Sequence, residues 1–384
     1  MADTPERYCL TKRRKSDILC VSSITYVNFT GYMQKKNKTL KDVARVAGVS
    51  TATVARVLHN KGYIAGDTRT RVAAAIQETG YRINAVARNL RKQRTVSIGH
   101  IVTSILPNPF YAGVALGAEQ EASRQGWSIL MINAQDDAQR ERLGVETFIQ
   151  QRVDAILFTT PTSEANVRLA LDAGVTVVQV ERPTSLATHT VVVDNYAGTV
   201  GAVEHLIAYG HRRIAFVGGD PALYPEKFFG RYVEEERFAG YRDTLGKYSL
   251  PLDKRLIILG LYSSSNVAAP CEHYISLKPL LQSDDRPTAV IISDMQAVCL
   301  LQELYACALR IPEDISVIGF DDTYAPYFAP PLTSVQQPML EIGKAAVRLA
   351  LKHSLEEAAS DHRTFEQVKL STRLILRSST GPVS

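Results

Sequence analysis

The chain has 384 residues, of which 45% are hydrophobic and 22% are charged. That length leaves room for two or three domains, and the composition is ordinary for a soluble globular protein. The sequence holds no run of about 18 apolar residues, which argues against a membrane-spanning helix, and its first residues do not form a secretory signal. We therefore expect a cytoplasmic protein with no membrane partner.

Positive charge is concentrated at the N-terminal end. Residues 1–95 hold 19 Lys and Arg against 6 Asp and Glu, a net charge of +13, whereas the remaining residues carry a net charge of −8. A basic end on an acidic body is typical of a polyanion-binding module joined to a soluble domain. A basic face can also be only a solvated surface, so the charge needs a structural motif beside it.

Residues 1–38 precede the first regular pattern, and we predict an N-terminal extension without helix or strand. Two explanations of this segment stay open. In one, translation starts at Met33 and the preceding residues are absent from the native protein. In the other, the segment is a disordered arm whose basic cluster Lys12–Lys15 adds non-specific contacts to phosphate.

A helix-turn-helix pattern begins at Thr39. The run up to Ala47 has apolar residues at helical spacing, with Thr39 as the N-cap. Gly48 ends this helix, and Ser50 caps a second helix over Thr51–Leu58. Two short helices joined by a glycine-containing turn are the helix-turn-helix signature, in which the second helix enters the DNA major groove.

A third helix is expected from about Thr68 to Thr79. Its apolar residues Val72, Ala73 and Ile76 would cover the first two helices. Gly80 stands at the position after the helix, where glycine is favoured.

These segments resemble the DNA-binding headpiece of the lactose-repressor (LacI/GalR) family of bacterial transcription regulators. The matching runs are TLKDVARVAGVS, TATVARVL and TRTRVAAAIQETGYRINAVARNL. The resemblance continues through the rest of the chain. It implies a helix-turn-helix DNA-binding domain over 39–83, a hinge helix and linker over 84–94, and a two-lobed effector-binding and dimerisation domain over 95–384. It also implies a sequence-specific repressor of a carbohydrate or related metabolite operon.

The resemblance implies that the headpiece contacts double-stranded operator DNA. The residues at the corresponding positions are Leu40, Ser50, Thr51, Ala52, Thr53, Arg56, His59, Asn84, Ala87 and Leu90. Arg56 suits a two-pronged contact to guanine, worth about 1–3 kcal/mol of discrimination; a phosphate contact is the alternative role. Ala55 and His59 replace the usual serine and asparagine, so we expect weaker non-specific affinity with specificity largely retained.

Residues 84–91 resemble the family's hinge helix. At about two turns this helix is too short to be stable alone in water, so we expect it to fold on DNA beside its twin from a second subunit. Leu90 matches the leucine that relatives insert into the minor groove, where an apolar wedge unstacks a base step and kinks the duplex. Ordinary packing in the linker is the alternative role of Leu90.

From Val96 onward, short apolar runs alternate with amphipathic helices. The expected strands are 96–102, 128–132, 155–159, 176–180, 190–193, 213–217, 256–261, 289–293 and 315–320. This alternation predicts parallel sheets covered by helices on both faces. The expected fold is therefore an all-α helix-turn-helix headpiece plus an α/β domain of two doubly wound parallel-sheet lobes, similar to a periplasmic binding protein. The second lobe would include a C-terminal strand, Leu370–Arg377.

Ligands of open α/β sheets bind at the carboxyl ends of the strands, so the effector cleft should lie between the lobes. Residues at strand ends, or at positions matching the family's effector contacts, are Phe110, Tyr111, Asn133, Asp137, Arg182, Asp194, Arg237, Ser293 and Asp321. Carboxylates and amides for hydroxyl groups, arginines, and an aromatic platform suit a sugar-like small molecule. A loop-surface role is the alternative for any single member, and Arg237 and Asp321 are the strongest candidates.

Departures from the family pattern leave the effector unidentified. Ser293 stands where relatives have asparagine, and the segments 220–237 and 266–274 differ from the pattern. Whether the effector releases or promotes DNA binding also stays open. The chain ends without a leucine-rich heptad run, so we expect a homodimer rather than a tetramer.

Other classes of protein fit the sequence less well. No GxSxG, P-loop or HExxH motif is present, so we expect no enzyme, no cofactor and no metal. The five cysteines form no CxxC pair, and we expect reduced thiols. A transporter's solute-binding protein would lack the helix-turn-helix. A non-specific, nucleoid-like DNA binder would show no operator preference.

Overall fold

The computed structural model describes residues 38–58, 62–81, 95–220, 222, 231–260, 274–356 and 364–383. The chain divides into two compact units, Met1–Asn84 and Ala85–Ser384, and each is described by itself. The predicted extension up to residue 37 and the predicted hinge over 84–91 lie outside the described residues. Among the described helices, none combines the length and hydropathy that a membrane span requires.

Three helices form the N-terminal unit: α1 (Leu40–Ala47), α2 (Thr51–Leu58) and α3 (Gly66–Thr79). The backbone N–H and the hydroxyl of Thr39 donate to Asp42 Oδ2 at 2.8 and 2.9 Å, which fixes the start of α1. Gly48 and Gly80 follow α1 and α3 with φ of 63° and 64°. Glycine adopts this left-handed backbone without a Cβ clash, so both helices end where the sequence predicts.

A small apolar core holds these helices together. Val43, Val54 and Val72, one from each helix, are fully buried. The expectation for Ala73 is wrong, because this residue is exposed and Ala75 is buried instead. Residue 75 lies three positions after Val72 on the inner face of α3, whereas residue 73 is rotated by about 100° away from it.

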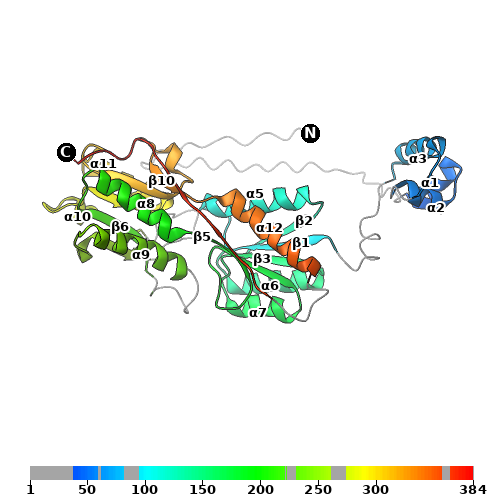
Figure 1. The fold of residues 1–384 in the computed structure, drawn as a ribbon, viewed down its shortest axis with the longest axis horizontal. Coiled ribbons are helices and arrows are strands. Elements are labelled where there is room, and N and C mark those ends of the chain that lie inside the picture. The colour runs from blue at the N-terminus through cyan, green and yellow to red at the C-terminus, as the bar shows by residue number, and fades with distance from the viewer. Residues whose placement is uncertain are drawn as a thin grey trace, which may run out of the picture. The chain divides into compact units, whose positions relative to one another are not determined.

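The second unit contains two α/β lobes (Figure 1). The sheet of the first lobe, sheet A, has the strand order β11-β5-β4-β3-β1-β2, with all its pairs parallel. Its strands are β1 (Ser97–Val102), β2 (Ser128–Asn133), β3 (Ala155–Thr159), β4 (Thr176–Val180), β5 (His189–Val193) and β11 (Gln367–Leu370). Its helices are α5 (Pro109–Arg124), α6 (Ala138–Gln150), α7 (Glu164–Asp172) and α12 (Met339–Glu356).

The sheet of the second lobe, sheet B, has the order β12-β10-β9-β8-β6-β7. Its strands are β6 (Ile214–Gly219), β7 (Ile257–Gly260), β8 (Ala289–Ile291), β9 (Ser316–Asp321), β10 (Thr333–Gln336) and β12 (Arg373–Ile375). The helices around it are α8 (Asn195–Ala208), α9 (Arg231–Lys247), α10 (Lys278–Leu281) and α11 (Asp294–Ala306), with short 3-10 turns at Lys254–Leu256 and Ala325–Tyr327. These strands confirm the predicted second α/β series, with shifts of a few residues at their ends.

Successive residues of the central strands alternate between two apolar layers. In sheet A, Leu157 packs with α5 and α12, whereas its neighbours Ile156 and Phe158 pack toward α6 and α7. Helices α5 and α12 approach so closely that a side chain at Gly117 or Gly343 would collide with the backbone of the other helix. Because both faces of the sheet are covered, the loops at the strand ends are left to form a site.

The expected single strand Leu370–Arg377 is wrong. The structure divides this segment into β11, which pairs in parallel with β5 of the first lobe, and β12, which pairs antiparallel with β10 of the second. The chain therefore crosses between the lobes here, as it also does after β5 and after β10. At this crossing the Asp194 N–H donates to the Leu370 carbonyl at 2.9 Å, so two crossing segments lie side by side.

The cysteines differ from expectation in one respect. Cys299 on α11 is disulfide-bonded, with its partner outside the described residues, so the prediction of reduced thiols is wrong for this residue. Cys307 is a free thiol. Among the described residues, no group of three or more His, Cys, Asp and Glu side chains is arranged to hold a metal ion.

Candidate functional site

The N-terminal unit presents the start of α2 to solvent. Thr51, Ala52 and Arg56 are exposed, while Val54 on the opposite side of the helix is buried in the core. Ser50 Oγ accepts a hydrogen bond from the Thr53 N–H at 3.1 Å and so caps the helix. The predicted base-reading side chains thus share one exposed face.

The other predicted DNA contacts fall into two groups. Leu40 packs partly against the core of the unit, so its side chain is not a free contact, and Thr53 is half-buried. His59, Asn84, Ala87 and Leu90 lie outside the described residues.

The carboxyl ends of the strands in both lobes carry an unusual concentration of left-handed backbone. Asp136, Thr160 and Glu181 follow β2, β3 and β4 with φ of 55°, 55° and 67°, and Asp321 at the end of β9 has φ of 101°. Non-glycine residues in this region are strained and cluster at functional sites. The strain therefore marks the strand ends where the sequence analysis placed the effector.

A buried ion pair joins the two lobes at this edge. Arg182, which follows β4, donates through Nη2 to Glu234 Oε1 on α9 at 2.8 Å, and its Nε lies 3.7 Å from Glu181 Oε1. Glu234 also accepts the Gly219 N–H at 3.0 Å, at the end of β6. Arg182 is 7% exposed and Glu234 is 1% exposed, so this pair is held away from water.

The second arginine is held by residues of the second lobe. Arg237 Nε donates to Asn195 Oδ1 at 2.9 Å, and Nη2 lies 3.5 Å from Asp321 Oδ1. Its guanidinium stacks on the Phe320 ring at 3.8 Å from the centroid. Gln337 Nε2 donates to the same Asp321 Oδ1 at 2.7 Å. The structure thus brings the two strongest candidates, Arg237 and Asp321, into contact.

Burial and charge act against each other in this cluster. Burial raises the pKa of Glu181 above its ordinary value, and the positive charges of Arg182 and Arg237 oppose that rise. Burial likewise raises the pKa of Asp321, against the charge of Arg237 and the hydrogen bond from Gln337. Each lobe contributes an arginine and at least one acid, so groups of opposite charge face one another across the lobes.

Tyr111, near the start of α5, lies at the same edge. Burial raises the pKa of its hydroxyl, and the negative charges of Glu181 and Asp136 raise that pKa further. The positive charge of Arg182 opposes this rise. A second contact between the lobes is nearby, since the Tyr324 hydroxyl donates to the Pro107 carbonyl at 2.8 Å.

The remaining predicted effector residues have other surroundings. Phe110 is 1% exposed within the core of the first lobe, which argues against the predicted sugar platform. Asp137, Asp194 and Ser293 each accept a backbone N–H at the start of a helix, of α6, α8 and α11 respectively, so their positions are explained by capping. Asn133 lies at the end of β2, and its Oδ1 accepts no hydrogen bond from the described residues.

Sequence reasoning missed three members of the cluster: Glu181, Glu234 and Gln337. An acid directly before Arg182 at a strand end is a signal that would have found Glu181. Glu234 and Gln337 carry no such signal, because only the folding of the lobes brings α9 and the segment after β10 to this edge.

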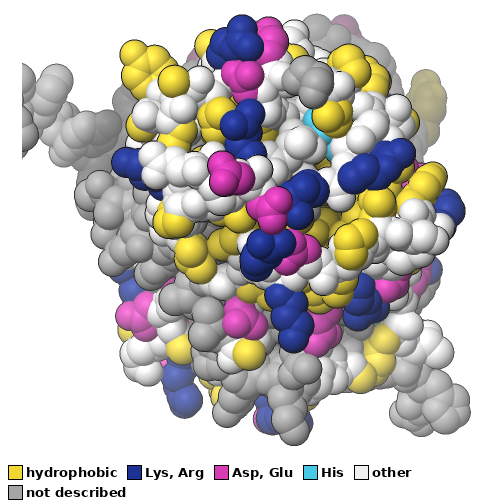
Figure 2. Space-filling model, turned by 90° about the vertical axis from the view of Figure 1, so that its left-hand side faces the viewer, with side chains coloured by type: hydrophobic (Ala, Val, Ile, Leu, Met, Phe, Trp, Pro, Cys, Tyr) yellow, Lys and Arg dark blue, Asp and Glu magenta, His cyan; other side chains and the backbone are white. Residues whose placement is uncertain are grey.

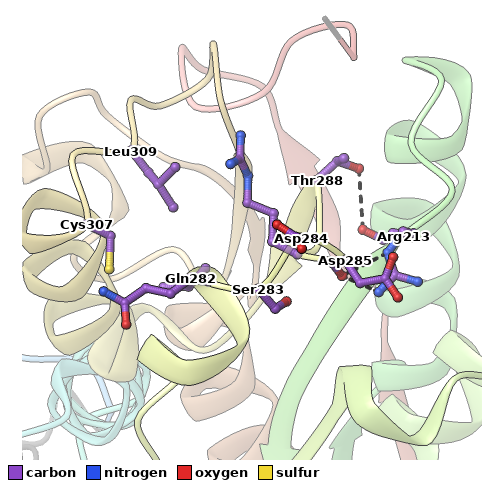
Figure 3. Close-up of a pocket in the computed structure, with 10 residues that line it drawn as sticks. Arg213, Gln282, Ser283, Asp284, Asp285, Thr288, Cys307 and Leu309 are labelled. Atoms are coloured by element: carbon purple, nitrogen blue, oxygen red, sulfur yellow. Dashed lines mark hydrogen bonds between the residues drawn. The ribbon is translucent and has the colours of Figure 1, made fainter.

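A separate hollow of about 690 Å³ lies at the opposite edge of sheet B (Figure 3). Arg213 and Thr288 line it, directly before β6 and β8, at the amino ends of these strands. Arg213 donates to the Asp285 carbonyl and lies 3.6 Å from Asp253 Oδ2. We do not assign the effector to this hollow, because ligands of parallel sheets bind at the carboxyl ends.

The outer end of the second lobe has a mixed surface (Figure 2). Lys and Arg side chains intermingle there with Asp, Glu and hydrophobic side chains. Such a surface lacks the one-sided positive charge that tracks a phosphate backbone. The face in view is therefore unlike the basic N-terminal region in its charge pattern.

Comparison with protein families gives three matches along the chain. Residues 39–84 match the model described as bacterial regulatory proteins, lacI family. Residues 98–269 match a periplasmic binding protein domain, and residues 203–380 match a periplasmic binding protein-like domain.

Curated relatives cover almost the whole chain. The HTH-type transcriptional repressor PurR of Haemophilus influenzae (strain PittEE) is 30% identical over 349 residues, which are 90% of this chain and 99% of the relative. The protein of the same description from Photobacterium profundum is 31% identical over 346 residues, 89% of this chain and 98% of the relative.

Solved structures agree in fold. A transcriptional regulator CelR–cellobiose complex is 30% identical with a TM-score of 0.62, covering 89% of this chain and all of that chain. A lac repressor dimer bound to operator and the anti-inducer ONPF is 25% identical with a TM-score of 0.71, covering 90% of this chain and all of that chain.

Proposed function

This chain belongs to the lacI family of bacterial regulatory proteins, and from that premise we propose that it represses a carbohydrate or related metabolite operon. It binds a near-palindromic operator as a homodimer, and a sugar-like small molecule in the cleft between its lobes controls that binding. The observation that carries this proposal is the buried cluster at the facing strand ends, where Arg237 and Asp321 meet. The protein works in the cytoplasm, on the nucleoid, without a membrane partner, a metal or a cofactor.

We assign recognition of the operator bases to the exposed face of α2. Arg56 supplies a two-pronged donor for guanine, and Thr51 and Ala52 are small enough to touch a thymine methyl. Ser50 and Thr53 shape the start of the helix, and His59 adds a phosphate contact. Asn84, Ala87 and Leu90 act in the hinge, with Leu90 inserted at the centre of the operator. A pyrimidine–purine step is favoured there, because such steps kink most readily.

The effector-binding part of the proposal keeps five of the predicted residues: Tyr111, Asn133, Arg182, Arg237 and Asp321. Their chemistry fits a polyol, with carboxylate and amide acceptors beside guanidinium donors and an aromatic ring. The structure of CelR with cellobiose and that of the lac repressor with ONPF, both relatives in fold, support a small-molecule site in such a domain.

An apolar edge of the first lobe supports the homodimer. β2 is the edge strand of sheet A, and helices α5 and α6 flank it. Leu116, Met131 and Leu143, one from each of these elements, are 50%, 49% and 53% exposed. Exposed large apolar side chains beside an unpaired strand edge are a surface that a second copy would cover.

Coupling between the effector and DNA would pass through the crossing segments. Lys369 Nζ lies 3.2 Å from Asp194 Oδ1 and 3.4 Å from Glu236 Oε1, next to Arg237 on α9. A ligand that moves Arg237 therefore acts on two of the three segments that join the lobes. By linkage, operator DNA must change effector affinity by the same factor as the effector changes DNA affinity.

In vitro selection of DNA by the full-length protein tests the operator half of the proposal. We expect enrichment of one near-palindrome with a central pyrimidine–purine step. A thermal-shift panel of sugars, polyols and nucleosides tests the other half, because a ligand at 100 times its Kd stabilises the native state by about 2.7 kcal/mol. Equal binding of all DNA sequences would overturn the repressor, and a tetramer mass in light scattering would overturn the dimer.

A further inference from the structure

The cleft cluster carries more negative than positive charge. Its three carboxylates, Glu181, Glu234 and Asp321, are 5%, 1% and 3% exposed, and within the described part of the chain they face two guanidiniums, those of Arg182 and Arg237. With all five groups ionised the cluster is left with one surplus negative charge. Buried charge of one sign is costly unless a partner of the other sign compensates it.

Both arginines already contact acids of the protein, although the buried Nη1 of Arg182 makes no hydrogen bond to the described residues. Arg182 contacts Glu234 and Glu181, and Arg237 contacts Asn195 and Asp321 and stacks on Phe320. A phosphate or carboxylate ligand would have to take these donors away from buried acids and would leave those acids without compensation. An anionic effector is therefore disfavoured by the same contacts that close the cluster.

A buried acceptor beside the cluster points to the missing partner. Gln337 is 2% exposed, and its amide nitrogen donates to Asp321 at 2.7 Å. The amide oxygen of Gln337 accepts no hydrogen bond from the described residues. The orientation of this amide is fixed by its chemistry, because a flipped amide would set its oxygen against the Asp321 carboxylate. The Gln337 amide oxygen is thus a buried acceptor that requires a hydrogen-bond donor.

The first lobe offers acceptors as well. The Glu181 and Asp136 carboxylates both act on the Tyr111 hydroxyl, and Asn133 Oδ1 accepts nothing from the described residues. An ammonium group offers three donors and no acceptor, and it is attracted to carboxylates and to an aromatic face. An ammonium group therefore matches the negative charge of this site, its hydrogen-bond acceptors and its aromatic side chain.

We propose that the effector of this cleft is an amino-bearing polyol, whose ammonium group is bound by the acceptor surplus around Glu181, Asp136 and Gln337. This inference rests on the proposed function, since it names the ligand class of the same site. The hydroxyl groups of the ligand pair with the remaining amide and carboxylate oxygens. Phosphorylated and carboxylated analogues are disfavoured by the negative charge of the three acids.

Matched trios of probes test the charge of the ligand. The full-length protein is heated with glucose, glucosamine and glucose 6-phosphate at equal concentration, and with the corresponding galactose and mannose trios. We expect the amino member of one trio to raise Tm most. A larger shift from a neutral or phosphorylated member overturns this inference and leaves the proposed function standing. If no probe raises Tm, the inference is overturned too. In that case the operator-selection experiment still tests separately whether the protein is a repressor.

Substitution of Glu181 tests the assignment of the subsite. Glu181→Gln keeps the size of the side chain, and we expect the Kd of the amino probe to rise about tenfold or more while that of its neutral analogue changes less than about twofold. Equal weakening of both would mean that Glu181 is only structural. Asp243→Asn, which removes an exposed carboxylate from the same helix as Glu234, is the matched control and should change neither Kd. Asp136→Asn carries the test if Glu181→Gln does not fold.

Discussion

The headpiece and the cleft place charged groups in opposite ways. In the headpiece the ionisable side chains lie at the surface, as Arg56 does, and a few alanines and valines form the core. In the cluster between the lobes, Arg182 and Arg237 are buried among acids contributed by both lobes. A polyanion with mobile counterions is bound by exposed charge, whereas a small molecule is selected by groups held rigid and dry. Removal of an exposed basic side chain should therefore reduce DNA binding without loss of stability in the first region, whereas removal of a buried charge should reduce stability in the second.

The largest effect is expected at the ion pair between the lobes. Glu234→Ala removes the hydrogen-bonded acidic partner of the buried Arg182, which should lower the free energy of unfolding of the effector domain by about 3–5 kcal/mol. Urea denaturation followed by circular dichroism measures this change. The double variant Arg182→Met/Glu234→Leu should recover most of the loss. If Glu234→Ala were as stable as wild type, the Arg182–Glu234 pair would have to be hydrated in solution.

His100 on β1 is expected to make stability depend on pH. Burial lowers its pKa from 6.5 to about 4, and its Nε2 lies 2.8 Å from Thr159 Oγ1. The unfolded chain takes up the proton first as pH falls, so stability should drop between pH 6.5 and 4 by up to about 3 kcal/mol. Urea midpoints across this range measure the slope, and His100→Asn should flatten it. Thr159→Val, which keeps the imidazole, should retain the slope.

Arg56 should show the reverse behaviour, with a loss of binding at constant stability. Arg56→Ala should weaken binding to the selected operator by about 1–3 kcal/mol and reduce discrimination at one base pair of each half-site. Gel-shift titrations with single-base operator variants measure both. Uniform weakening across all sequences would assign Arg56 to phosphate instead, and the Tm of the headpiece should stay within error of wild type.

The smallest expected effect is at the start of α1. Thr39→Ala removes the hydroxyl contact to Asp42 and should cost about 1 kcal/mol of headpiece stability. Thermal unfolding followed by circular dichroism measures this loss. Thr70→Ala is a suitable control, because the Thr70 hydroxyl donates to the Gly66 carbonyl within α3 and does not cap the helix. Equal losses in the two variants would show that the cap has no special role.

The same two regions differ in how far the sequence predicts them. The helices of the headpiece are fixed by neighbours a few positions apart, such as Thr39 with Asp42 and Gly48 after Ala47, so local pattern suffices. Its one error, Ala73 in place of Ala75, arose because several alanines in succession give no periodicity. Strands β1 to β9 were also predictable, since buried parallel strands are short continuous apolar runs, whereas β10 was missed and β11 and β12 were expected as one strand.

Residues of the cluster between the lobes could be proposed from the sequence where they lie at a strand end or within two residues of it, although Glu181 was missed there and Arg237 on α9 came from the family resemblance. Arg182 and Asp321 meet that condition, whereas Glu234 reaches Arg182 across 52 positions of sequence, which no local pattern encodes. Phe110 and Tyr111 are adjacent on α5, and sequence alone does not tell which ring enters the core. Asp137, Asp194 and Ser293 illustrate another ambiguity, because a polar residue at a strand end is also the preferred cap of the next helix.

The three crossings between the lobes bear on how the protein is made. Helix α12 and strand β11 belong to the first lobe, yet they are encoded in the final stretch of the chain, from Met339 to Leu370. A ribosome that has released β1 to β5 has therefore delivered a sheet without its outer strand and without the helix that covers β3, β4 and β5. The headpiece can fold early in translation. The first lobe can complete its sheet only after α12 and β11 have been synthesised, and the second only after β12.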